Sequence, residues 1–134
     1  MKKINTIFIV DDDPITVFGM RKILESVVEC NAISTFQNGK LALENILNSL
    51  REDLEIPEII FLDINMPIMD GWEFLDEFIT LPIKNKIRIN IVTSSINQAD
   101  HEKWQQFMLR THHTITFNNK PLRKENIAEI TTAA

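Results

Sequence analysis

The sequence predicts an α/β fold, in which helices cover both faces of a parallel sheet. Short apolar runs rich in β-branched and aromatic residues, such as 7–10 and 59–62, have the length and composition of buried parallel strands. Segments whose apolar residues recur at helical spacing lie between these runs. Because five such strands alternate with five helices, a doubly wound sheet built from βαβ units is the most economical architecture.

The first half of the chain predicts two helices after the strand at 7–10. The first helix should begin near Pro14, because Asp13 supplies an N-cap. Its apolar positions are Val17, Met20, Leu24 and Val27. Residues 32–36 alternate enough to predict a second, less buried strand before the Asn38-Gly39 turn. One face of the next helix is expected to consist of Leu43, Ile46, Leu47 and Leu50.

The second half continues the alternation after the strand at 59–62. A third helix is expected between Asp70-Gly71 and Pro82, burying Leu75, Phe78 and Ile79. In the strand expected at 87–92, Arg88 and Asn90 alternate with apolar residues, which predicts partial solvation. A fourth helix should be lined by Trp104, Phe107 and Met108. A strand at 114–117 and a short helix carrying Ile127 and Ile130 complete the pattern.

Length and composition restrict the classes of protein. A chain of 134 residues with 44% hydrophobic residues is expected to form one domain over 1–134. Its net charge of -5 and lack of a Lys/Arg stripe argue against direct nucleic-acid binding. The single cysteine, Cys30, is expected to be a buried thiol and fits a reducing compartment. Because no stretch resembles a signal peptide or a membrane span, we expect a soluble cytoplasmic protein.

Acidic residues follow two of the predicted strands. Asp11, Asp12 and Asp13 come after the first strand, and Asp63 comes after the third. Ligands of open α/β sheets bind at the carboxyl ends of the strands. If the two strands are neighbours, these carboxylates repel one another, and a divalent cation would relieve that cost. Since helix capping accounts for Asp13, the pattern predicts a metal site with one acid left for chemistry.

Four segments carry a family resemblance when they are read in order. They are Ile-Val-Asp-Asp-Asp-Pro at 9–14, Leu-Asp-Ile-Asn-Met-Pro-Ile-Met-Asp-Gly at 62–71, Val-Thr-Ser at 92–94 and Lys-Pro at 120–121. Together they resemble the receiver domain of two-component response regulators, and the match extends over essentially the whole chain. The resemblance implies a flavodoxin-like (βα)5 fold with strand order 2-1-3-4-5, similar to single-domain chemotaxis regulators.

The resemblance also implies a chemical site. Asp63 would accept a phosphoryl group from a histidine kinase or a phosphotransfer protein, and a carboxylate can attack phosphorus without a general base. Asp12 would coordinate Mg²⁺ directly beside Asp63, and Asp11 would help through water. The backbone carbonyl of Asn65 would be a further ligand. Magnesium suits this set because it keeps several waters and takes only one or two carboxylates.

Further residues are assigned by the same resemblance. Thr93 would hydrogen-bond a phosphoryl oxygen, and Lys120 would pair with another. Ser94 would supply a small side chain and a backbone amide, whereas the role of Ser95 stays open. Phe117 falls where the family carries an aromatic switch residue, more often tyrosine, that moves into the space vacated by Thr93. Because phenylalanine has no hydroxyl, partner recognition would depend on packing at the surface of the fourth helix, fifth strand and fifth helix.

Other positions give weaker signals. In relatives the bond between Lys120 and Pro121 is often cis. His112 and His113 are adjacent and are therefore expected to point apart as surface residues. Trp72 is expected to be partly in the core. The segment 110–116 lacks the glycine or alanine that the family often has there, which leaves its loop shape open.

The leading interpretation is a phosphorylation-dependent switch that changes its affinity for an unknown downstream protein. It would act as a monomer or weak dimer through the fourth helix, fifth strand and fifth helix, with no enzymatic or DNA-binding output segment. One alternative is a magnesium-dependent aspartyl phosphatase, although such enzymes carry Asp-x-Asp whereas Ile64 and Asn65 follow Asp63. Another is a degenerate binding module. The Asp, Asp, Thr and Lys at the four positions argue against it.

Overall fold

The computed structural model describes residues 2–95 and 97–131. Within them, one parallel sheet has the strand order β2-β1-β3-β4-β5. The strands are β1 (Lys2–Val10), β2 (Val28–Phe36), β3 (Ile59–Leu62), β4 (Arg88–Thr93) and β5 (Thr114–Asn119). The helices are α1 (Pro14–Val27), α2 (Gly39–Arg51), α3 (Gly71–Phe78), α4 (Gln98–Met108) and α5 (Lys124–Glu129). The predicted fold class and strand order are confirmed.

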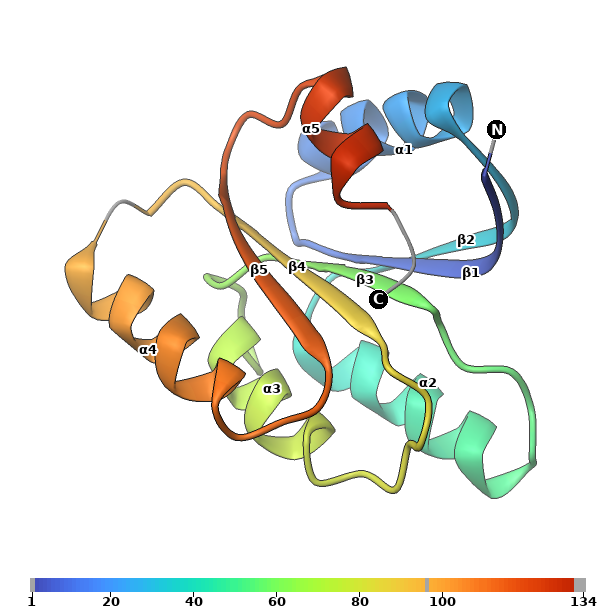
Figure 1. The fold of residues 1–134 in the computed structure, drawn as a ribbon, viewed down its shortest axis with the longest axis vertical. Coiled ribbons are helices and arrows are strands. Elements are labelled where there is room, and N and C mark those ends of the chain that lie inside the picture. The colour runs from blue at the N-terminus through green and yellow to red at the C-terminus, as the bar shows by residue number, and fades with distance from the viewer. Residues whose placement is uncertain (1, 96, 132–134) are drawn as a thin grey trace.

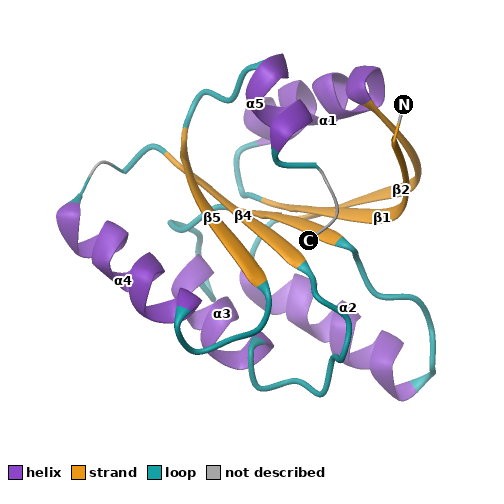
Figure 2. Ribbon diagram, viewed as in Figure 1, coloured by secondary structure: helices purple, strands orange, loops and turns teal. Residues whose placement is uncertain are grey.

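Helices cover both faces of the sheet, with α1 and α5 on one side and α2, α3 and α4 on the other (Figures 1 and 2). Strand β3 is buried on both faces, as its unbroken apolar run predicts. Ile59 and Phe61 pack toward α1 and α5, and Ile60 and Leu62 pack into the core under the other helices. None of the helices in the described ranges is both long and apolar enough to cross a bilayer.

Strands β1 and β2 extend further than their sequence patterns indicate. The register pairs Lys2 with Val28, so β2 begins directly after α1 rather than at Ala32. The reason is that β2 is an edge strand, where several side chains remain exposed and apolar alternation is weak. Leu47 and Met108, which were placed on the apolar faces of α2 and α4, remain 40% and 37% exposed.

Asn90 is fully buried, contrary to the predicted solvation of the first half of β4. Its amide nitrogen donates to the Ile130 carbonyl at 2.7 Å, and its amide oxygen accepts from the Thr116 hydroxyl at 2.8 Å. Burial of this polar side chain is tolerated because both ends of the amide are hydrogen-bonded. The side chain thereby ties β4 to β5 and to the end of α5.

The prediction that both adjacent histidines lie on the surface and point apart was wrong. They lie in the turn before β5, and their rings are 4.0 Å apart. His113 is buried and accepts the Ile87 backbone N–H at its Nδ1 atom, at 2.9 Å. His112 remains exposed. Cys30 also differs from prediction, because it is partly exposed on edge strand β2.

Candidate functional site

The sheet register brings the predicted site residues to one edge. Val10 pairs with Leu62, so Asp11 and Asp63 follow on neighbouring strands. The Asp63 N–H donates to the Val10 carbonyl at 2.9 Å, which fixes this alignment. At the ends of β4 and β5, the Lys120 N–H donates to the Thr93 carbonyl at 2.8 Å. The carboxyl ends of four strands therefore carry the predicted residues, as expected for a parallel sheet.

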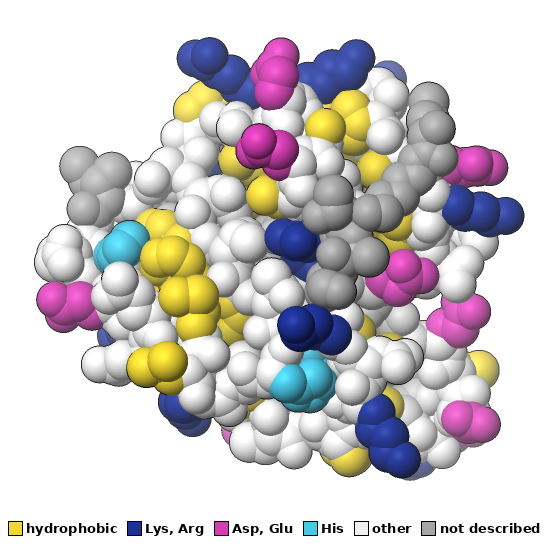
Figure 3. Space-filling model, in the orientation of Figure 1, with side chains coloured by type: hydrophobic (Ala, Val, Ile, Leu, Met, Phe, Trp, Pro, Cys, Tyr) yellow, Lys and Arg dark blue, Asp and Glu magenta, His cyan; other side chains and the backbone are white. Residues whose placement is uncertain are grey.

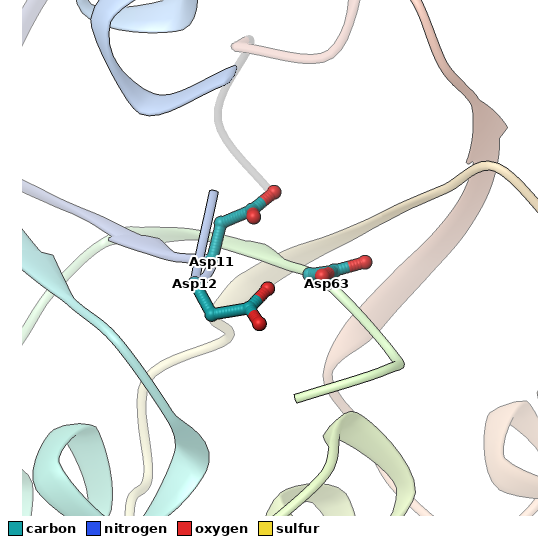
Figure 4. A group of neighbouring side chains, drawn as sticks. All are labelled: Asp11, Asp12 and Asp63. Carbon is teal, nitrogen blue, oxygen red and sulfur yellow. The ribbon is translucent and has the colours of Figure 1, made fainter. Parts of the chain in front are cut away.

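Three carboxylates form the centre of this edge. Asp11, Asp12 and Asp63 each place one oxygen within 4.8 Å of those of the other two. Figure 4 shows these side chains next to one another after β1 and β3. Asp11 and Asp63 are buried, whereas Asp12 is exposed. The cluster is therefore partly shielded and still open to an ion or substrate from solvent.

Lys120 bridges two of these acids. Its Nζ atom lies 2.9 Å from Asp11 Oδ2 and 3.5 Å from Asp63 Oδ1. Burial alone would lower the pKa of Lys120, but the hydrogen bonds and charges of Asp11 and Asp63 outweigh it and raise the pKa. The ammonium therefore stays charged. The peptide bond between Lys120 and Pro121 is cis, as the resemblance implies.

Asp63 is electrostatically distinct. Burial, followed by repulsion from Asp11, raises its pKa to about 6, although Lys120 and the Ile64 N–H oppose this shift. The Ile64 N–H donates to Asp63 Oδ1 at 2.9 Å. The carboxyl is still mostly ionised at pH 7. The raised pKa reflects burial first and the charge of Asp11 second, and a nearby cation would favour the ionised carboxylate.

The donor set fits a hard divalent cation. Three carboxylates supply only oxygen, the ligand type of Mg²⁺, and with one ammonium they leave two net negative charges. Asn65, whose carbonyl is a further predicted ligand, is exposed just after Asp63. Asp13 is the N-cap of α1, because its carboxylate accepts hydrogen bonds from the Ile15 N–H and the Thr16 hydroxyl. The predicted capping role of Asp13 is confirmed.

Thr93 and Phe117 occupy the neighbouring strands β4 and β5. Thr93 is fully buried, and its hydroxyl oxygen accepts the Ser95 N–H at 3.1 Å. The half-buried Phe117 ring has its centroid 5.5 Å from that of His101 and 5.7 Å from that of Trp104. Figure 3 shows hydrophobic side chains and a histidine gathered over this region of α4 and β5. The ring of Phe117 therefore lies against α4.

Sequence reasoning missed two features of the site. At Gly71, an added Cβ would lie 2.5 Å from the Asp63 carbonyl oxygen, so a glycine is needed there for close approach and not only for a turn. The second feature is Asp100, which accepts hydrogen bonds from both Ser95 and Trp72. The close approach at Gly71 has no local sequence signal. Asp100 resembles an ordinary acid in the first turn of a helix.

The fold is a doubly wound sheet, and its carboxyl edge carries an acid cluster and a lysine. These features define a class of α/β domains whose site binds a cation or a phosphate group. The chain belongs to the response regulator receiver domain family, whose profile matches residues 7–131.

Individual relatives agree with this assignment. A protein-glutamate methylesterase/protein-glutamine glutaminase of Methanococcoides burtonii is 44% identical over 63 residues, which cover 47% of the chain and 16% of that relative. A two-component response regulator from Cytophaga hutchinsonii has a TM-score of 0.79 and 26% identity, with coverage of 96% of this chain and 95% of that one. CheY in a CheX-CheY-BeF3-Mg complex from Borrelia burgdorferi shares the fold, with a TM-score of 0.74, 24% identity and coverage of 93% and 84%.

Proposed function

We propose that this chain is a signalling switch of a two-component system, in which Asp63 accepts a phosphoryl group from a histidine kinase or a phosphotransfer protein. The main support for this proposal is the geometry of the acid cluster. Oxygens of Asp11, Asp12 and Asp63 lie within 4.8 Å of one another, and Lys120 bridges two of these acids. The chemistry is confined to modification of Asp63 and its reversal, with no separate substrate turned over.

The transfer needs no general base, because the attacking carboxylate of Asp63 is already ionised. A carboxylate oxygen of Asp63 forms a bond to phosphorus while the bond from phosphorus to the donor nitrogen or oxygen breaks, and the donor leaves with that electron pair. Lys120 lies where it can pair with a phosphoryl oxygen in exchange for its contact with Asp63. Thr93 is proposed to donate its hydroxyl to another phosphoryl oxygen. Preorganised donors of this kind stabilise charge as it develops in the transition state.

Magnesium is the proposed cofactor, held by Asp11, Asp12, Asp63 and the Asn65 carbonyl. When bound, it would neutralise the two excess negative charges and so reduce repulsion of an anionic phosphodonor. The chain's own contribution is to hold the carboxylates in register: the Asp13 N–H donates to one Asp11 oxygen, and Lys120 binds the other. A relative of known structure, Rcp1, has been solved with Mn²⁺ bound.

The output surface is proposed to comprise α4, β5 and α5. Capture of Thr93 by the phosphoryl group would let Phe117 leave its contacts with His101 and Trp104 and turn inward. An unknown downstream protein would then bind the altered surface, and a weak dimer could use the same face. Borrelia CheY, solved with CheX, beryllium fluoride and Mg²⁺, is a fold relative described with a partner protein.

Labelling by acetyl phosphate tests the function. With Mg²⁺ present, the intact protein should gain the mass of one phosphoryl group, and Asp63→Asn should abolish the gain. Asp76→Asn is a matched control because it removes an exposed acid from α3. Full labelling of Asp63→Asn would overturn the assignment. No labelling of the wild type would favour a degenerate binding module. Steady phosphomonoester hydrolysis that needs Asp63 would favour the aspartyl phosphatase.

A further inference from the structure

A chain of hydrogen bonds leads away from the acid site through the turn after β4. Its first link is the Ser95 N–H, which donates to the buried hydroxyl oxygen of Thr93 at 3.1 Å. The Ser95 carbonyl accepts from the Asn119 side chain at 2.8 Å, next to Lys120. The position of Ser95 is therefore tied to the two strand ends from which the phosphoryl-binding side chains project.

The Ser95 side chain continues the chain of bonds into α4. Its hydroxyl donates to Asp100 Oδ2 at 2.7 Å, and the other Asp100 oxygen accepts the Trp72 indole N–H at 3.1 Å. Both Asp100 contacts are partly buried. Hydrogen bonds to a charged acceptor are stronger than neutral ones. One carboxylate thus joins the turn after β4, helix α4 and helix α3.

The α3 end of this connection is packed against α4. Trp72 is buried, and its ring stacks on Phe107 of α4 with a centroid separation of 5.7 Å and an interplanar angle of 9°. Trp72 also follows Gly71, whose backbone N–H donates to the Ile64 carbonyl beside Asp63. Both ends of the network therefore reach the acid site, one through Thr93 and the other through the start of α3.

Capping of α4 does not explain Asp100. Asn97 performs that task, because its side chain accepts the Ala99 N–H at 2.8 Å. Instead, both Asp100 oxygens are directed to side chains of other segments, one in the turn after β4 and one in α3. The carboxylate thus serves contacts between elements rather than the start of its own helix.

We infer that Asp100 is a positioning residue that holds Ser95, and through it Thr93, in the arrangement observed here, and so opposes capture of Thr93 by a phosphoryl group. The inference rests on the proposed function of the same site. On this proposal, capture by a phosphoryl group draws the Thr93 hydroxyl toward Asp63 and lengthens its bond from the Ser95 N–H. The Ser95–Asp100 bond resists that movement. Breaking it should make the phosphorylated arrangement easier to reach.

Titration with beryllium fluoride and Mg²⁺, followed by NMR, tests this role. The two indole N–H signals distinguish Trp72, bonded to Asp100, from Trp104, which donates to the Ile115 carbonyl. Asp100→Ala removes both acceptor contacts. Ser95→Ala leaves the Trp72–Asp100 bond in place and removes the Ser95–Asp100 bond, together with the hydroxyl that accepts the Asn97 N–H. Both variants should bind beryllium fluoride about three- to tenfold more tightly than the wild type, as expected when one hydrogen bond opposes binding. The wild-type Trp72 signal should shift on binding, and the shift should be much smaller in Asp100→Ala.

Glu102→Gln is the matched control, because it removes one negative charge from an exposed position of the same helix. Its affinity should equal that of the wild type. Wild-type affinity in both Asp100→Ala and Ser95→Ala, or weaker binding in either, would overturn the role of Asp100. If Asp100→Ala does not fold, Ser95→Ala alone decides. Failure of the wild type itself to bind beryllium fluoride would instead refute the proposed function.

Discussion

At the scale of single residues, buried polar side chains do most to distinguish this protein from a generic α/β sheet. Asn90 and His113 were both expected to meet solvent, and both are buried with hydrogen-bond partners. His113 accepts a backbone N–H at Nδ1, so this nitrogen carries no hydrogen and the ring is neutral. Burial, followed by the charge of His112, lowers the pKa of His113 to about 4.

This shift predicts a pH dependence of the free energy of unfolding. Because the unfolded histidine has a pKa of 6.5, the unfolded chain takes up the extra proton between pH 6.5 and about 4. The contribution of His113 is therefore complete above pH 6.5 and is lost as the pH falls toward 4. It should amount to roughly 1–3 kcal/mol.

Urea unfolding at pH 7.5 and at pH 4.5 checks this prediction. His113→Gln should lose less stability than the wild type between these two conditions, because the titrating ring is gone. His112→Gln is the control, since that neighbour is exposed and should keep most of the wild-type slope. Equal slopes for His113→Gln and the wild type would show that the buried ring contributes nothing to the pH dependence.

The sequence predicted the acid cluster far better than the buried polar residues, for a physical reason. Asp11, Asp12 and Asp63 directly follow apolar strands, so their position at the sheet edge follows from the strand pattern. The burial of His113 depends on Ile87, which is 26 positions away in the chain. The contacts of Asp100 with Trp72 likewise join two helices. Such partners are set by tertiary packing and leave no local pattern.

At the scale of elements, the start of α3 is the most constrained junction near the site. An added Cβ at Gly71 would lie 2.5 Å from the Asp63 carbonyl oxygen and 3.0 Å from Ile64 Cα. Because both obstacles are backbone atoms, neither can rotate away. Gly71→Ala should lower the free energy of unfolding by about 1–3 kcal/mol and slow labelling of Asp63, since the displaced backbone carries the nucleophile.

Gly19, inside α1, is the matched comparison for Gly71. No atom outside its own helix backbone and its chain neighbours lies within 4 Å of an added Cβ there. Gly19→Ala should therefore stabilise the protein by up to about 1 kcal/mol through helix propensity. Urea unfolding of both variants, together with acetyl phosphate labelling rates, checks the pair. A harmless Gly71→Ala would mean that the α3 junction does not constrain Asp63.

The boundaries of helices and strands were likewise predicted well only where the sequence signal is local. Helix α1 begins at Pro14 as its N-cap and proline predict, because that signal is local. The early part of β2, by contrast, follows α1 without a loop and has a mixed burial pattern. Its strand conformation comes from pairing with β1, beginning at Val28 opposite Lys2. Periodicity alone cannot detect such a strand.

At the scale of the whole molecule, the apolar cores and the charged site occupy different parts of the fold. Two apolar cores on opposite faces of the sheet hold the strands in register, and the charged side chains of the site lie only at the carboxyl edge. Keeping Asp63 ionised at this edge costs free energy because the side chain is buried and Asp11 is close, as its raised pKa indicates. Binding of a divalent cation would relieve that cost. The apolar cores and the charged edge are thus parts of one arrangement.

The most direct test is a crystal structure of the wild type grown with Mg²⁺ and beryllium fluoride. We expect one ion about 2.1 Å from oxygens of Asp12, Asp63 and the Asn65 carbonyl. Beryllium fluoride should be attached to Asp63, with Thr93 and Lys120 donating to its fluorine atoms. An ion or beryllium fluoride bound elsewhere, with Asp63 unmodified, would show that Asp63 is not the phosphoacceptor of a metal site.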